Sequence, residues 1–219
     1  QLAAEKEIDL ECLAVAALRH LSLHDDLKRP LVVAGVLPPV VRCVSWANED
    51  LMCQLAGLLA NLSEHQENQI TLVEGASVPA LVTLARADND EVQQDTSRCL
   101  ANLASNEDCH LPIYKQGGLM AMVKLTEGQN DITQRYAAMG LRFMAADPDV
   151  RILIMQDGRV QPFVAMATSS LLEYRRTAGI ALASFSLHES NKPLMVQTGC
   201  VKALLSLGMQ DDLSTKRDA

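Results

Sequence analysis

The sequence repeats itself every 41 residues, as from Gly158 to Gly199. Glycine falls at one position of the period in four units, and the pair Gly75 and Ala76 fills the same slot in the remaining unit. The glycine column consists of Gly35, Gly117, Gly158 and Gly199. A second column holds leucine in every unit, at Leu18, Leu59, Leu100, Leu141 and Leu182. Units of equal length without insertions fold by stacking on their neighbours. The chain is therefore predicted to form an array of similar units rather than one closed core.

Each unit divides into three apolar segments, which predict three helices. In the unit 25–65, a short segment over 27–34 ends at Gly35, where a positive φ can terminate a helix. A second segment over 37–47 carries two prolines in its first turn, which a helix tolerates there. A longer segment over 50–63 has leucines at spacings of three and four residues. We call these the first, second and third helix of a repeat.

Composition favours helices packed on helices and excludes two classes of partner. Hydrophobic residues make up 48% of the chain, but aromatic residues only 3%. The longest uncharged apolar stretch, 31–41, is too short to span a bilayer and contains glycine and proline. The net charge of −8 argues against binding to duplex nucleic acid, which needs a positive field. We therefore expect an all-α protein with no direct membrane insertion and no nucleic-acid partner.

The six cysteines show no CxxC pair and no metal-ligand spacing. Most of them fall inside apolar runs, where a free cysteine behaves as a small hydrophobic residue. No basic segment followed by an apolar one marks a signal peptide. Reduced, buried thiols and a cytoplasmic location are predicted, and a nuclear location stays open.

The repeat resembles a known one. Its unit reads apolar-x-x-Gly-x-apolar-Pro, followed later by Leu-Ala-Asn-Leu, and its clearest copies are Val33-Ala34-Gly35-Val36-Leu37-Pro38, Leu59-Ala60-Asn61-Leu62-Ser63 and Leu100-Ala101-Asn102-Leu103-Ala104. Over essentially the whole chain this pattern is similar to the armadillo repeat, and nearer to β-catenin-like and vacuolar-armadillo-protein-like members than to importin-α. The resemblance implies a right-handed all-α solenoid of three-helix units.

The register divides the chain into a single solenoid of whole and partial repeats. Residues 1–24 are expected to supply the second and third helices of a leading repeat, and residues 189–219 the first two of a trailing repeat. Four full repeats lie between them, at 25–65, 66–106, 107–147 and 148–188. Neither end has the polar face of a capping repeat. We therefore expect a segment of a longer solenoid, able to associate end to end with another copy.

No motif for catalysis or for a cofactor occurs. The sequence lacks GxSxG, a P-loop and a glycine-rich dinucleotide fingerprint. His24, His65 and His188 share one repeat position, but equivalent positions in adjacent repeats lie about 8–10 Å apart, and zinc needs ligands at about 2 Å. That position follows a third helix and favours a cap or turn residue. The chain is predicted to be no enzyme and to hold no metal and no cofactor.

The resemblance places peptide binding in a concave groove lined by the third helices. An asparagine late in the third helix binds the peptide backbone in such proteins, because an amide side chain offers both a donor and an acceptor. The column at this position holds two asparagines and three other residues, namely His20, Asn61, Asn102, Phe143 and Ser184. The tryptophans that importin-α-type grooves carry one turn earlier are absent.

Arginines gather on three successive third helices. They are Arg98, Arg135, Arg142, Arg175 and Arg176. A guanidinium binds carboxylate or phosphate in a fork, so Arg98, Arg135 and Arg176 predict an acidic peptide as the ligand. Tyr136, Met139 and Phe143 beside them can serve as apolar anchors. The alternative is that the arginines pair with Asp95, Asp131 and Glu173 on a solvated charged face.

These observations predict a non-catalytic scaffold for protein–protein interaction, which binds an extended acidic segment in its groove. Two alternatives stay open. One is a nuclear-transport adaptor of the importin-α type, which would bind a basic peptide. The other is an autoinhibitory or assembly module of a larger protein.

Overall fold

The computed structural model describes the backbone of residues 2–46 and 48–209, and the side chains of residues 8–46 and 48–209. Within these ranges the secondary structure is helical, without a strand. Two compact units make up the chain, residues 1–140 and residues 141–219, and their boundary falls within helix α10. Each unit is described by itself.

The first unit contains the repeating set of three helices that the sequence predicts. Its third helices begin after an asparagine: Oδ1 of Asn48 accepts from the backbone N–H of Leu51, and Oδ1 of Asn89 accepts from that of Val92. The helices are α1 (Leu2–Leu21), α2 (Asp25–Val33), α3 (Leu37–Arg42), the 3-10 helix η1 (Cys43–Trp46), α4 (Glu49–Ser63), α5 (Gln66–Glu74), α6 (Ser77–Leu84), α7 (Asp90–Ala104), α8 (Glu107–Lys115), α9 (Gly118–Leu125) and α10 (Asp131–Ala146).

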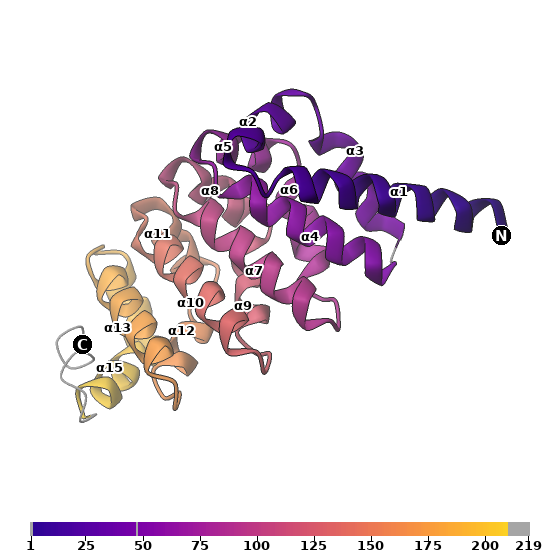
Figure 1. Ribbon diagram of the computed structural model, residues 1–219. Coiled ribbons are helices and arrows are strands. Elements are labelled where there is room, and N and C mark those ends of the chain that lie inside the picture. The colour runs from indigo at the N-terminus through magenta and orange to yellow at the C-terminus, as the bar shows by residue number, and fades with distance from the viewer. Residues whose placement is uncertain (1, 47, 210–219) are drawn as a thin grey trace. The chain divides into compact units, whose positions relative to one another are not determined.

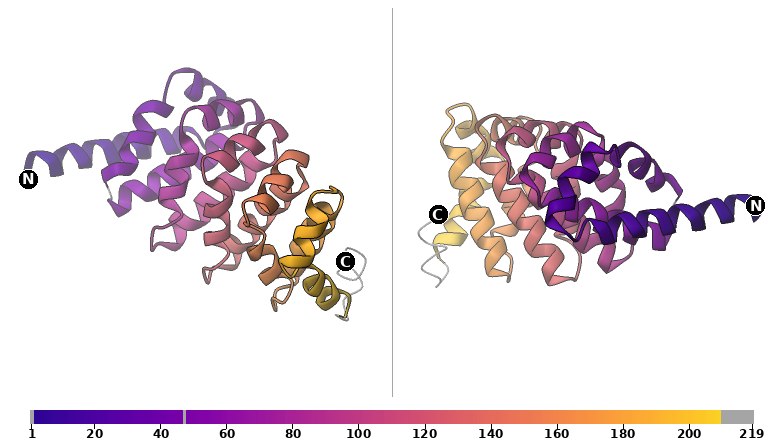
Figure 2. Two further views of the ribbon diagram at one scale, coloured as in Figure 1. Left: turned by 180° about the vertical axis from the view of Figure 1, so that it is seen from behind. Right: turned by 45° about the horizontal axis from the view of Figure 1, so that its top comes forward.

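Helix α1 differs from the prediction. Two helices were expected in residues 1–24, but α1 runs without a break from Leu2 to Leu21, as both views of Figure 2 show for the indigo helix. In the next three repeats an asparagine, at position 48, 89 or 130, caps the third helix after a turn. The corresponding position in the leading repeat is Glu7, and glutamate is not among the residues preferred as an N-cap. The helix continues through the position of the turn.

Like helices stack on like helices in the first unit. The third helices α1, α4 and α7 lie side by side (Figure 1), and they make extensive contacts with one another. The first helices α2, α5 and α8 form a second row, and α3, α6 and α9 a third. The leucine column that revealed the repeat lies in the core, where Leu59 and Leu100 are fully buried. Burial of such leucines between layers is the main force that holds the repeats together.

The turn between the first and second helix explains the glycine column. Gly35, Gly117, Gly158 and Gly199 all have a positive φ, between 69° and 87°. In the remaining repeat the same slot holds Ala76, which has φ 61° and is the one described non-glycine residue with a positive φ. Gly75 precedes the slot and has φ −78°. The positive φ is thus a property of this position in the repeat, whether glycine or alanine occupies it.

The second unit continues the same order of helices. It contains the end of α10, then α11 (Pro148–Gln156), α12 (Gln161–Met166), α13 (Leu172–Ser186), α14 (Asn191–Gln197) and α15 (Cys200–Gly208). Its core centres on Phe163 and Phe185, whose rings meet edge to face at 5.3 Å. Helices α14 and α15 are the first two helices predicted for the trailing repeat, of which residues 210–219 lie outside the described residues.

Candidate functional site

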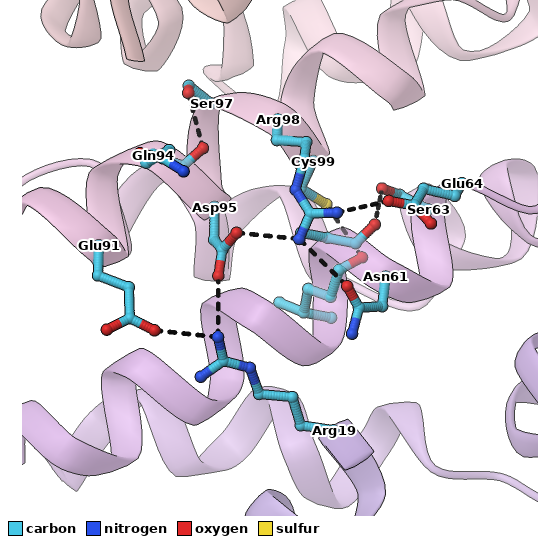
Figure 3. Close-up of polar contacts among 12 residues, drawn as sticks. Arg19, Asn61, Ser63, Glu64, Glu91, Gln94, Asp95, Ser97, Arg98 and Cys99 are labelled. Atoms are coloured by element: carbon cyan, nitrogen blue, oxygen red, sulfur yellow. Dashed lines mark hydrogen bonds and ion pairs between the residues drawn. The ribbon is translucent and has the colours of Figure 1, made fainter. Parts of the chain in front are cut away.

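Charged and amide side chains of neighbouring third helices meet in the first unit (Figure 3). Glu91, Asp95 and Arg98 lie on α7, spaced so that they share one face of the helix. They face Arg19 of α1 and two residues at the end of α4, Asn61 and Glu64. Two residues of α2, Asp25 and Lys28, extend the set. We call this set the polar network, and its members are Arg19, Asp25, Lys28, Asn61, Glu64, Glu91, Asp95 and Arg98.

Arg98 lies at the centre of the polar network. Its Nη1 donates to Glu64 at the end of α4, and its Nη2 donates to Oδ1 of Asp95 at 2.9 Å and to Oδ1 of Asn61 at 3.1 Å. Burial alone would lower the pKa of Arg98, but the hydrogen bond to Asp95 and the charges of Asp95 and Glu64 outweigh it, so the pKa is raised. The guanidinium is thus held by groups of this chain on two sides.

Arg19 reaches from α1 across α4 to α7. Its Nη2 donates to Glu91 at 2.9 Å and lies 3.5 Å from a carboxylate oxygen of Asp95, while its Nη1 donates to the carbonyl of Cys53 at 3.3 Å. Gly57 of α4 makes this path possible, because a Cβ there would stand 2.1 Å from Nε of Arg19. A residue without a side chain in one third helix therefore lets an arginine of the previous repeat contact the next repeat.

The polar network extends to α2 through a buried lysine. Nζ of Lys28 donates to Glu64 and, at 2.6 Å, to Asp25. Burial opposes the charge of Lys28, but these hydrogen bonds outweigh it and raise its pKa. The charges alternate in sign along the chain of contacts Asp25, Lys28, Glu64, Arg98, Asp95, Arg19 and Glu91. Three cations against four carboxylates give a net charge of −1.

The two asparagines predicted to bind a peptide differ in how much of their hydrogen-bonding capacity is still available to a ligand. Asn61 is 6% exposed; its Nδ2 donates to Oγ of Ser22 at 3.0 Å, and its Oδ1 accepts from Arg98. Asn102 is half-buried, and its Nδ2 donates to Oγ of Ser63 at 3.0 Å. No donor within the described ranges reaches Oδ1 of Asn102. Asn61 is thus engaged at both ends of its amide, and Asn102 at one.

The other predicted residues of the first unit lie outside the polar network. His20 of α1 and Arg135 of α10 are exposed, while Tyr136 and Met139 are half-buried. Neither an ion pair nor a side-chain hydrogen bond joins Arg135 to another residue of the described part of the chain. Arg135 therefore offers a free guanidinium to solvent.

The remaining predicted residues belong to the second unit. Arg176 pairs with Glu173 at 3.2 Å, one of the pairings that the charged-face alternative names, as Arg98–Asp95 is in the first unit. The guanidinium of Arg142 lies 5.6 Å from the centre of the Phe143 ring. Oγ of Ser184 donates to the carbonyl of Ile180. Each of these three contacts lies within one repeat.

Sequence reasoning missed Arg19, Glu64 and Glu91. Each of them contacts a residue 34 or more positions away, and a single sequence gives no signal for pairs at that distance. One signal was present: Gly57 occupies the column that holds Arg98 in the next repeat. In the structure the side chain of Arg19 fills the space beside Gly57.

The described part of the chain contains free thiols, but no cluster of metal ligands and no helix able to span a membrane. No group of three or more His, Cys, Asp or Glu is placed to hold a metal ion in the part of the chain that the structure describes. All six cysteines are free thiols, and burial raises the pKa of Cys99 to about 12. Of the helices described, none is both long enough and apolar enough to cross a membrane.

Comparison with family models and with curated proteins finds no match. Solved structures do match. An engineered protein gives a TM-score of 0.77 at 25% identity, over 96% of this chain and 87% of that one. Computationally designed armadillo repeat proteins for modular peptide recognition give 0.79 at 21%, over 94% and 88%. A designed armadillo repeat protein in complex with the peptide (KR)4 gives 0.76 at 20%, over 98% and 90%.

These likenesses and the helix order establish the fold. The chain has the all-α fold of armadillo repeat solenoids, with three helices to a unit, as the resemblance implied.

Proposed function

We propose that the protein is a non-catalytic scaffold that binds an extended peptide segment along its third helices. The observation that carries the proposal is the half-paired amide of Asn102. Its Oδ1 can accept a hydrogen bond from a peptide N–H, and the second hydrogen on Nδ2 can donate to a peptide carbonyl. An amide with a free acceptor and one free N–H can bind the backbone of any extended sequence. The designed proteins of the same fold that recognise peptides support this reading.

The finer proposal is that the bound segment is acidic. Arg135 is exposed and unpaired among the described residues, so it can bind a carboxylate without giving up another contact. Arg98 and Arg176 can do so only by exchanging Glu64 and Glu173 for a ligand carboxylate. Further proposed contacts, together with Asn61, are His20, Tyr136, Met139, Phe143 and Ser184. The sequence resemblance to β-catenin-like members supports an acidic protein partner. The proposed location of the protein is the cytoplasm, with the nucleus as the alternative.

A basic segment is the second candidate, and the polar network favours it. Glu91 has 57% of its side chain exposed and Glu64 has 39%, against 24% and 23% for Arg19 and Arg98. The carboxylates are thus the groups that a ligand meets first. The whole chain carries a charge of −8, and one designed protein of this fold is in complex with (KR)4. A nuclear-transport adaptor would use its third helices in this way.

Two peptides of equal length distinguish the candidates: (KR)4 and an alternating Glu-Ser octapeptide. Each is titrated by fluorescence anisotropy against the protein, Asn102→Ala, Arg135→Glu and the control Lys115→Glu. Lys115 is exposed on the first helix α8, so its variant makes the same change in charge away from the third helices. Asn102→Ala should weaken whichever peptide binds. Arg135→Glu should weaken the acidic peptide and strengthen the basic one.

The proposal fails if neither peptide binds, or if Lys115→Glu changes affinity as much as Arg135→Glu.

End-to-end self-association stays a separate prediction. The exposed side chains of Leu10 and Leu13 on α1 and of Leu205 on α15 are those that such a contact would cover. Sedimentation at several concentrations tests it.

A further inference from the structure

A cavity of about 490 Å³ lies between α1 and the second helix of the following repeat, formed by α3 and η1. Its walls are largely aliphatic, with Val15 and Leu18 from α1 and Val40 from α3. Glu11 and Trp46 add a carboxylate and an indole. The volume is in the range of sites that take a small molecule or a large side chain. None of the lining residues belongs to the polar network.

Glu11 carries the unsatisfied group of this cavity. Its Oε2 is buried and accepts no hydrogen bond from the described residues. The weakly donating thiol of Cys43 lies close to the carboxylate, and burial, the charge of Glu11 and a hydrogen bond to Glu11 raise the pKa of Cys43, while Oε2 stays unpaired. Arg42 lines the same cavity and is exposed, but it leaves Oε2 without a donor. A buried carboxylate oxygen without a donor is costly, and a ligand that supplies one gains what the protein lacks.

The later repeats have no carboxylate at the position of Glu11. At the position of Glu11, three of them have a donor that binds a carbonyl just after the second helix of its own repeat. These pairs are Gln93 to Ala87 at 2.7 Å, Gln134 to Gly128 at 2.7 Å and Arg175 to Ser169 at 2.9 Å. The unbroken α1 has no helix end at the equivalent place, and Glu11, which can only accept, lines the cavity instead. A donor with positive charge is the ligand group that matches a carboxylate.

Trp46 contributes an aromatic surface to the cavity. It is the chain's single tryptophan and is 38% exposed. An indole attracts cations to its face, and aliphatic walls accommodate the methylene groups of a long basic side chain. We propose that this cavity binds a lysine or arginine side chain of a partner polypeptide, with Glu11 as its counter-ion and Trp46 as its aromatic wall. This inference does not depend on the proposed function, because the third-helix residues take no part in it.

The test uses the fluorescence of Trp46, which has no background from other tryptophans. The protein is titrated with Nα-acetyl-lysine amide at constant ionic strength, to about 100 mM because one side chain binds weakly. Nα-acetyl-norleucine amide serves as the neutral probe with a similar stem. A saturable change with the lysine derivative and none with the norleucine derivative supports the proposal. Equal responses to both, or no saturable response to the lysine derivative, overturn it.

Glu11→Gln separates charge from shape. It keeps the side chain's size and removes the counter-ion, so affinity for the lysine derivative should fall by about tenfold or more. The matched control is Glu107→Gln, an exposed residue in the first turn of α8, which should leave the affinity unchanged. Far-UV circular dichroism checks that both variants are folded. Unchanged affinity in a folded Glu11→Gln protein would overturn the role of Glu11.

Discussion

The guanidinium of Arg98 lies 3.1 Å from Oδ1 of Asn61 and donates a hydrogen bond to it. The same asparagine donates to Ser22, which follows α1, so one buried amide connects three successive repeats. Arg19 makes a comparable connection to Glu91, which is 72 residues away. The polar network is thus a set of cross-links between third helices. Its stability effects can be measured apart from any ligand.

Asn61→Ala should destabilise the protein more than Asn102→Ala. The first change removes two buried side-chain hydrogen bonds, one to Ser22 and one from Arg98, and should cost about 1–3 kcal/mol. The second removes one hydrogen bond from a half-buried side chain and should cost about 1 kcal/mol or less. Urea unfolding followed by circular dichroism gives both values. Equal losses would contradict the difference in burial and pairing described here.

The contact between Gly57 and Arg19 predicts a coupling. Gly57→Ala favours the helix by about 1 kcal/mol, but the new methyl group would displace Arg19 from Glu91 and Asp95. In the background of Arg19→Ala the obstacle is gone, and the substitution should stabilise by nearly the full amount. Unfolding free energies of the two single variants and the double variant give a coupling of about 1 kcal/mol. The same gain in both backgrounds would mean that Arg19 does not occupy this space.

Two substitutions in one repeat slot should act in opposite directions. Ala76 has φ 61° and Gly35 has φ 84°. A residue with a Cβ is strained at a positive φ. Ala76→Gly should therefore stabilise the protein and Gly35→Ala should destabilise it, each by about 1 kcal/mol. No atom lies within 4 Å of a Cβ at Gly35, so the effect there comes from the backbone alone. Thermal unfolding of both variants measures it, and shifts of equal sign would count against the assignment.

The sequence predicts the repeat well because each helix is determined by nearby residues. The glycine slot and the leucine column both act within one unit, and the structure has them where the period places them. The joining of residues 2–21 into one helix was not predicted, because the leading segment keeps the apolar pattern of the later repeats.

The candidate site is harder to predict because its contacts cross repeats. Asn61 and Asn102 are equivalent in sequence, yet Arg98 follows in the repeat after Asn61, and the repeat after Asn102 has Met139 at that position. One asparagine therefore has an arginine to bind and the other does not. The availability of each amide depends on its neighbour in the next unit, which the pattern of a single unit does not contain.

Thiol reactivity should follow burial. Cys12 and Cys53 are half-buried, whereas burial raises the pKa of Cys99 to about 12 and that of Cys109 to about 11. Only the thiolate is alkylated, so at pH 8 iodoacetamide should modify Cys12 and Cys53 well before the buried pair, as mass spectrometry of timed digests can follow. In denaturant the six thiols should react alike, which controls for differences in local sequence.

The same thiols predict how stability depends on pH. An acid whose pKa is higher in the folded state than its ordinary value, 9.0 for these cysteines, keeps its proton when the unfolded chain has lost it. The contribution is therefore complete below about pH 9 and is lost as the pH rises from there toward 12. Cys99→Ala should make the unfolding free energy fall less steeply over this range, measured by urea unfolding at successive pH values. An unchanged slope would mean that Cys99 ionises as readily in the folded protein as in the unfolded chain.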